Sequence, residues 1–197
     1  MNTRHHYVKT TLERGDSAGG DGHTLIGLAV PFDVELEVYD WWDGDYLEVF
    51  RKGSFAKTIR ENPGPPLLAH HDHREMPLGV ATELVERSDG LHGIWRVSAT
   101  PRGDEAVTLV GDGAISGLSI GFEPITDKTT HAKDRGAPMD LVERTEVRLR
   151  EISLCNFPAY ETAGVTGQRS RPPVGRPLAE LAAYRAAQVD RFGRISR

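Results

Sequence analysis

Apolar runs of the length of β-strands recur along the middle of the chain, separated by polar, Gly-rich and Pro-rich stretches. Runs of this kind, bounded by turn residues, are typical of strands in a buried sheet. Two of them flank Ser88-Asp89-Gly90, a turn sequence that favours a β-hairpin and therefore antiparallel pairing. Six segments share the pattern and are predicted as strands: residues 24–32, 46–50, 78–86, 91–97, 114–122 and 142–154.

Two short helices are predicted between these strands. Residues 53–60 have helical spacing of their apolar side chains, with Ser54 as the N-cap. Residues 102–110 follow Thr100, which can cap a helix that begins with a proline. Residues 127–138 are polar and are predicted as a loop. Because strands outnumber helices, the expected fold class is mainly β with helices (α+β), an antiparallel β-barrel-like core flanked by a few short helices.

The pattern divides the chain into four parts. Residues 1–23 lack periodicity and are predicted as a flexible N-terminal arm, and residues 24–163 form the body. Residues 164–177 are rich in Gly, Pro and Arg and are predicted as a linker. Residues 178–197 are predicted as a C-terminal amphipathic helix or tail, which packs on the body or on a partner.

Composition narrows the classes of protein that fit. The 197 residues include a single cysteine, Cys155, so a disulfide framework and a Cys-rich metal site are excluded. No apolar run reaches the roughly 20 residues that a membrane span requires, and the N-terminus lacks the apolar core of a secretory signal. We therefore expect a protein of the reducing cytoplasm that is neither secreted nor membrane-bound.

Charge is unevenly distributed along the chain. The net charge is −5, of which residues 168–197 carry +5 and residues 1–167 carry −10. An acidic body is a poor electrostatic match for DNA or RNA, so no specific nucleic-acid partner is expected.

Histidines gather in the segment 66–79, where His70, His71 and His73 surround Asp72. Imidazole exchanges protons near neutral pH, so the segment can supply a general base. Imidazole and carboxylate are also suitable metal ligands, although adjacent side chains of an extended chain point in opposite directions. A polar loop with solvated histidines is the third interpretation that the residues leave open.

A serine between glycines marks a second candidate. Residues 117–121 match G-x-S-x-G around Ser119, the pattern of a nucleophile elbow. That elbow requires a following helix, whereas the continuation here is extended and contains Pro124. The α/β-hydrolase context therefore fails, and a Gly-rich strand in a tight barrel is the alternative.

A carboxylate on a predicted strand is the third candidate. With a period of two, Val147, Leu149, Glu151 and Ser153 share one face, which we expect to be the buried one. A buried carboxylate needs a hydrogen-bonding partner. A histidine or a neighbouring arginine would serve.

Taken together, these segments resemble the prohead (capsid maturation) serine proteases of tailed phages, distant relatives of the herpesvirus assemblins. The resemblance extends from about Leu25 to Ala163, and its specificity lies in the order and spacing of the segments. It is carried by Gly27–Phe32, Glu48–Phe55, Leu67-Leu68, His71-Asp72, Pro77–Gly79, Ser119–Phe122, Glu151–Leu154 and Pro158-Ala159.

The resemblance implies an assemblin-like fold, with residues 24–163 as the protease domain, and a catalytic triad without metal or cofactor. By position in the motifs, His71 is the general base, Ser119 the nucleophile and Glu151 the acidic third member. The chain order His, Ser, acid is physically acceptable because triads are defined by geometry and roles. The neighbouring His70 keeps the register of the base open.

The function implied is that of a serine endopeptidase of capsid assembly in the host cytoplasm, acting inside assembling proheads. Its substrates would be scaffolding segments and extensions of the major capsid protein, and self-cleavage within residues 164–177 is a further hypothesis. A homo-oligomer is left open. Two alternatives remain: a non-catalytic assembly module with the same fold, and a metal-dependent hydrolase that uses the cluster of His70, His71, Asp72 and His73.

Overall fold

The computed structural model describes residues 4–9, 22–38, 44–156 and 165–168, and every structural statement below concerns these ranges. The strands are β1 (Arg4–Lys9), β2 (Thr24–Pro31), β3 (Leu36–Val38), β4 (Tyr46–Phe50), β5 (Pro66–Ala69), β6 (Gly79–Glu86), β7 (Gly90–Val97), β8 (Gly117–Thr130), β9 (Asp140–Cys155) and β10 (Val165–Gln168). The helices are α1 (Ala56–Glu61), α2 (Pro101–Gly111) and α3 (Ala132–Arg135). The expected class, mainly β with a few short helices, is confirmed.

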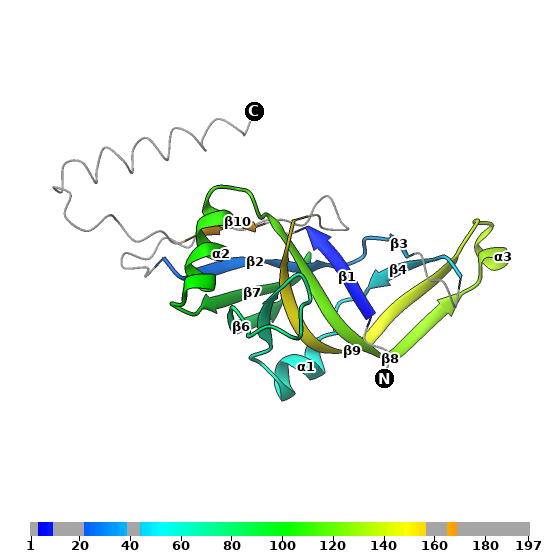
Figure 1. Cartoon of the computed structure of the whole chain (residues 1–197). Helices are drawn as coiled ribbons and strands as arrows, with labels where there is room; N and C mark the ends of the chain where they lie inside the picture. Colours follow the sequence, from blue (N-terminus) through cyan, green and yellow to red (C-terminus); the bar gives the residue numbers. More distant parts are fainter. Residues whose placement is uncertain (1–3, 10–21, 39–43, 157–164, 169–197) are drawn as a thin grey trace, which may run out of the picture.

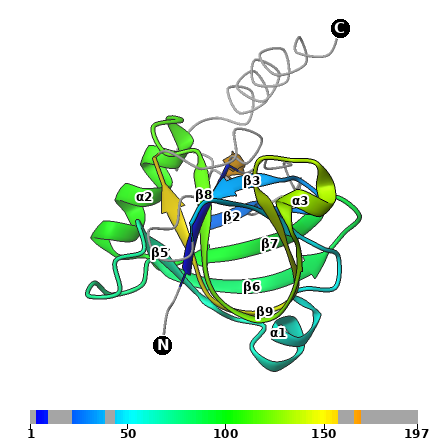
Figure 2. The ribbon, with the colours of Figure 1, turned by 90° about the vertical axis from the view of Figure 1, so that its right-hand side faces the viewer.

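The strands form one strongly curled sheet in the order β1-β8-β9-β5-β6-β7-β2-β10, with β4 attached to β9 and β3 to β4. Figure 1 shows the long β8–β9 hairpin, and Figure 2 shows the sheet curling into a barrel-like shape. Most pairings are antiparallel, as predicted, but β4 and β5 both run parallel to β9. The parallel pairing sets the carboxyl end of β5 beside the carboxyl end of β9.

The core lies inside the curl and is rich in aromatic side chains. Phe50 stacks on Phe55 with ring centroids 5.6 Å apart and meets Phe122 edge-on at 5.2 Å. Trp95 is completely buried and belongs to the same hydrophobic core cluster. Because side chains alternate along β8, the burial of its apolar positions in the core leaves Ser119 on the opposite face of the sheet.

A β-bulge in the β8–β9 pair changes which residues of β9 share a face. Gly121 pairs with Glu151 and Phe122 with Leu149, so Arg150 is the extra residue. Beyond the bulge Ile152 enters the core, and Glu151 therefore lies on the face opposite Leu149. The prediction that these two residues share one face was wrong, because strict alternation does not survive an inserted residue.

Two local predictions are corrected by the structure, and two further segments contain strands. Ser54 does not cap α1, which begins after Phe55 without a side-chain cap. Residues 127–138 are not simply a loop, because β8 continues through Thr130 and α3 follows. The predicted arm contains β1, which pairs with β8, and the predicted linker contains β10, which pairs with β2. A sheet edge offers unpaired backbone groups, and these segments satisfy them.

Other predictions are confirmed. The 78–86 and 91–97 hairpin is β6–β7. Thr100 caps α2 by accepting a hydrogen bond from the backbone N–H of Gly103. The predicted helix over residues 178–197 lies outside the described residues. Within the described ranges, the structure contains no helix with the length and apolar character needed to traverse a bilayer.

Candidate active site

Ser119 sits near the start of β8, between Leu118 and Ile120, which point into the core. Its backbone neighbours on the sheet are Tyr7 of β1 on one side and Ser153 of β9 on the other. Its side chain is fully buried. The serine is thus held by a paired strand and not by a strand-to-helix elbow, as the failed hydrolase context indicated.

His71 reaches this face through a sharp turn after β5. The backbone N–H of His70 still bonds to the carbonyl of Leu154 at 3.0 Å, as a continuation of the parallel pairing. His70 and His71 then adopt left-handed conformations, with φ of 52° and 57°. A non-glycine residue in this region costs about 1–2 kcal/mol, and such strain often accompanies a functional site. The turn carries the His71 ring back over β9.

The three residues of the predicted triad lie in one hydrogen-bonded row. Nε2 of His71 is 2.6 Å from Oγ of Ser119, and Nδ1 is 2.5 Å from Oε1 of Glu151. With Nδ1 carrying the proton and donating to the carboxylate, Nε2 is free to accept from the serine hydroxyl. All three side chains are buried, and the Glu151 residue is only 1 % exposed. This arrangement suits general-base activation of a hydroxyl.

Burial and distance distinguish His71 from its neighbours as the candidate base. His70 and His73 are exposed, whereas His71 is buried against Ser119. Asp72 forms an ion pair with Arg74 at 3.1 Å instead of facing an imidazole. Within the described residues, no group of three or more His, Cys, Asp or Glu side chains is arranged to hold a metal ion.

The Glu151 carboxylate has two further neighbours that sequence reasoning missed. Ser153 donates a hydrogen bond to Oε2 at 2.7 Å. Gly121, the cross-strand partner of Glu151, lies so close that a Cβ at that position would collide with Oε1. The signal for Ser153 was its spacing of two from Glu151 on one strand, and the signal for Gly121 was the glycine pair around Ser119.

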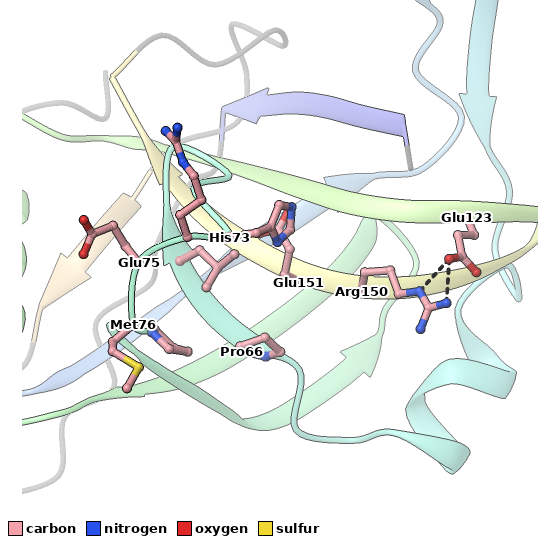
Figure 3. Close-up of a pocket in the computed structure, with 10 residues that line it drawn as sticks. Pro66, His73, Glu75, Met76, Glu123, Arg150 and Glu151 are labelled. Atoms are coloured by element: carbon pink, nitrogen blue, oxygen red, sulfur yellow. Dashed lines mark hydrogen bonds and ion pairs between the residues drawn. The ribbon is translucent and has the colours of Figure 1, made fainter. Parts of the chain in front are cut away.

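An open hollow adjoins the carboxylate, as Figure 3 shows. Its lining includes Pro66 and Leu68 of β5, the exposed Met76, and the Glu123–Arg150 ion pair. Hydrogen bonds from Arg150, with a weaker contribution from Arg148, hold the pKa of Glu123 below its usual value despite partial burial. Arg150 reaches Glu123 from the bulge, so the bulge shapes the wall of the hollow.

Cys155 ends β9 and is buried. Burial, reinforced by the negative charge of Glu151, raises the pKa of its thiol to about 12. A neutral thiol of this kind is a poor nucleophile. Ser119 and not Cys155 is therefore the candidate nucleophile of this face.

Three comparisons with known proteins found similar chains. A family model described as caudovirus prohead serine protease matches residues 10–174. The prohead protease of Enterobacteria phage HK97 is 30 % identical over 155 residues, which cover 77 % of this chain and 63 % of that protein. The chain thus spans just under two-thirds of the length of this relative. The structure of the bacteriophage T4 capsid assembly protease is similar at 11 % identity with a TM-score of 0.48, covering 79 % of this chain and 95 % of that one.

Proposed function

The chain belongs to the caudovirus prohead serine protease family, and from this premise we propose that it is a serine endopeptidase with Ser119, His71 and Glu151 as its catalytic triad. The observation that carries the proposal is the continuous hydrogen-bonded row from Oγ of Ser119 through the His71 ring to the Glu151 carboxylate.

The mechanism is acyl transfer. Nε2 of His71 takes the proton of Ser119 as Oγ attacks a peptide carbonyl, and the imidazolium then gives that proton to the leaving amine. Water attacks the acyl-enzyme with His71 again as the base, which releases the new carboxyl end and restores the serine hydroxyl. Glu151 holds Nδ1 protonated and stabilises the imidazolium as it forms. Burial of the row strengthens that stabilisation, because water does not screen it.

The substrates that we propose are coat-protein extensions and scaffolding segments, processed in the host cytoplasm inside assembling proheads. Membership of the prohead serine protease family and similarity to the prohead protease of HK97 support this proposal. Self-cleavage within residues 164–177 stays a prediction.

The proposal is tested by covalent labelling with a fluorophosphonate probe. We expect the wild-type chain to label at Ser119, and the Ser119→Ala and His71→Ala variants to lose at least 99 % of the labelling rate. Ser54→Ala is the matched control. Ser54 is also fully buried, and within the described part of the chain its hydroxyl has no hydrogen-bond partner. This variant should label like the wild type.

Co-expression with the coat protein, followed by mapping of new termini, tests the substrate. New coat-protein termini that are absent with Ser119→Ala support the proposal. An unlabelled wild-type chain that leaves the coat protein intact contradicts it and favours a non-catalytic assembly module. Stoichiometric bound zinc without labelling would favour the metal-dependent hydrolase instead.

A further inference from the structure

Ser153 lies beneath the predicted triad and bonds to two of its members. Its hydroxyl donates to Oε2 of Glu151 at 2.7 Å and accepts from the backbone N–H of His71 at 3.0 Å. The residue is completely buried, and its register partner across the β8–β9 pair is Ser119. One hydroxyl therefore touches both the carboxylate and the backbone that carries the base, directly beside the nucleophile's strand.

We propose that Ser153 is a positioning residue that sets the Glu151 carboxylate and the His71 ring relative to each other, an inference that rests on the proposed function. Ser153 does not touch the reacting atoms and acts only through its two neighbours.

The first part of the argument concerns the carboxylate. The terminal torsion of a glutamate is broad and has no sharp preferred angle, so the covalent structure alone does not aim the two oxygens. Oε1 faces Nδ1 of His71, and Oε2 faces the Ser153 hydroxyl. With both oxygens bonded in a buried site, the plane of the carboxylate is set, and Oε1 is presented to the imidazole.

The second part concerns the backbone of His71. Its φ of 57° is a conformation that a histidine adopts only where the surroundings favour it. A buried backbone N–H also needs an acceptor. The Ser153 oxygen supplies one and thereby favours the turn that swings the imidazole over β9. Loss of the hydroxyl would loosen both the base and the group that orients it.

A serine that only fills space would behave differently, and Ser54 provides the comparison. Both residues are fully buried, but the Ser54 hydroxyl lacks a hydrogen-bond partner among the described residues and lies at the entry to α1. Ser54→Ala and Ser153→Ala therefore delete the same atom from two buried sites, and only the second deletion touches the triad.

The experiment measures the second-order rate constant for labelling of Ser119 by a fluorophosphonate. Circular dichroism gives the folded fraction of each variant, and the rate constant is divided by that fraction so that it refers to native molecules. We expect Ser153→Ala to lower this rate by at least tenfold, a loss typical of a hydrogen bond to a charged group. Ser153→Thr, which keeps the hydroxyl, should restore most of the rate. With a peptide substrate taken from a mapped cleavage site, kcat should fall and KM should stay within about twofold.

A double-mutant cycle with Glu151→Ala separates positioning from general loosening. The bond to the His71 backbone persists without Glu151, but the bond to the carboxylate does not. Ser153→Ala should therefore cause a loss at least threefold smaller in the Glu151→Ala background than in the wild type. A Ser153→Ala rate within twofold of the wild type, or an equal loss in both backgrounds, overturns the inference. Should Ser153→Ala not fold, the same limits apply to Ser153→Cys, because a thiol is a much weaker donor. Failure of the proposed function is distinguishable, since then the wild-type chain itself would not label.

Discussion

Gly121 shows how one missing side chain shapes the candidate site. It pairs with Glu151 across the strands, and the carboxylate oxygen that faces His71 occupies the space a Cβ would need. Any larger residue must push Oε1 away from Nδ1. Glycine is thus required here by close approach, not by an unusual backbone angle.

We expect Gly121→Ala to lower the labelling rate of Ser119 by about ten- to a hundredfold, because the displaced carboxylate no longer orients the imidazole. The decrease in the free energy of unfolding should be smaller than the free-energy equivalent of the lost labelling rate, because a side chain and not the backbone must move. Gly64→Ala is the matched control, because its Cβ would meet the Ala81 carbonyl at an ordinary 3.4 Å. Equal rates for Gly121→Ala and the wild type would contradict this reading of the contact.

Residue types alone did not reveal Gly121 or Ser153. Their roles depend on which residues face each other across β8 and β9, and the bulge at Arg150 changes that pairing. The resemblance to a protease family, by contrast, identified His71, Ser119 and Glu151 as candidates, and the structure brings these three side chains within hydrogen-bonding distance. Their catalytic roles remain a proposal.

At the scale of elements, apolar runs predicted the central strands and the β6–β7 hairpin well, because these segments face the core. The short strand β5 was missed because it lies among prolines and next to the histidines. The outer half of β8 was missed because its exposed side chains carry no apolar signal. The parallel pairing of β5 with β9 was not predicted, because neither strand has a sequence pattern specific to parallel pairing.

The bulge has an electrostatic consequence that can be measured. Arg150 holds the pKa of Glu123 below its ordinary value, so ionised Glu123 is favoured in the folded chain. The resulting stability is present above pH 4.5, near the unfolded carboxyl's pKa, and is lost as the pH falls through the lower folded value.

Arg150→Ala should therefore reduce the free energy of unfolding by about 1 kcal/mol or less at pH 7, where the pair is partly screened by water and Arg148 partly replaces the lost cation. The difference from the wild type should shrink towards zero as the pH falls below 4.5 and through the lower folded pKa. Urea denaturation at neutral and at acidic pH measures it. Arg96→Ala is the control, because Arg96 is exposed and has no ion pair among the described residues. A difference that grows in acid would refute the assigned sign.

At the scale of the whole molecule, the candidate site is assembled from distant parts of the chain. His71 is 48 residues from Ser119 and 80 from Glu151 along the sequence. The three come together through the pairing of β5 and β8 with β9, so the row of hydrogen bonds requires these three strands to be paired.

The same curled sheet contains Cys155, which is buried at the end of β9. With a pKa of about 12, only about one thiol in 10⁴ would be ionised at pH 8 even if reagent could enter. We expect native protein to react with a thiol-specific disulfide reagent at least a hundredfold more slowly than chain unfolded in guanidinium. The unfolded chain should release one equivalent of the reagent's thiolate per protein molecule, because it contains one cysteine. Rapid stoichiometric reaction of the native protein would show that the end of β9 opens readily.

This burial has a practical use. If the Cys155 thiol does not react in the native protein, it does not need to be removed before labelling. A single cysteine introduced on the surface can then carry a fluorophore or a spin label. Reporters placed along β1, beside the strand of Ser119, could then follow in real time whether that edge parts from its neighbour when a peptide arrives.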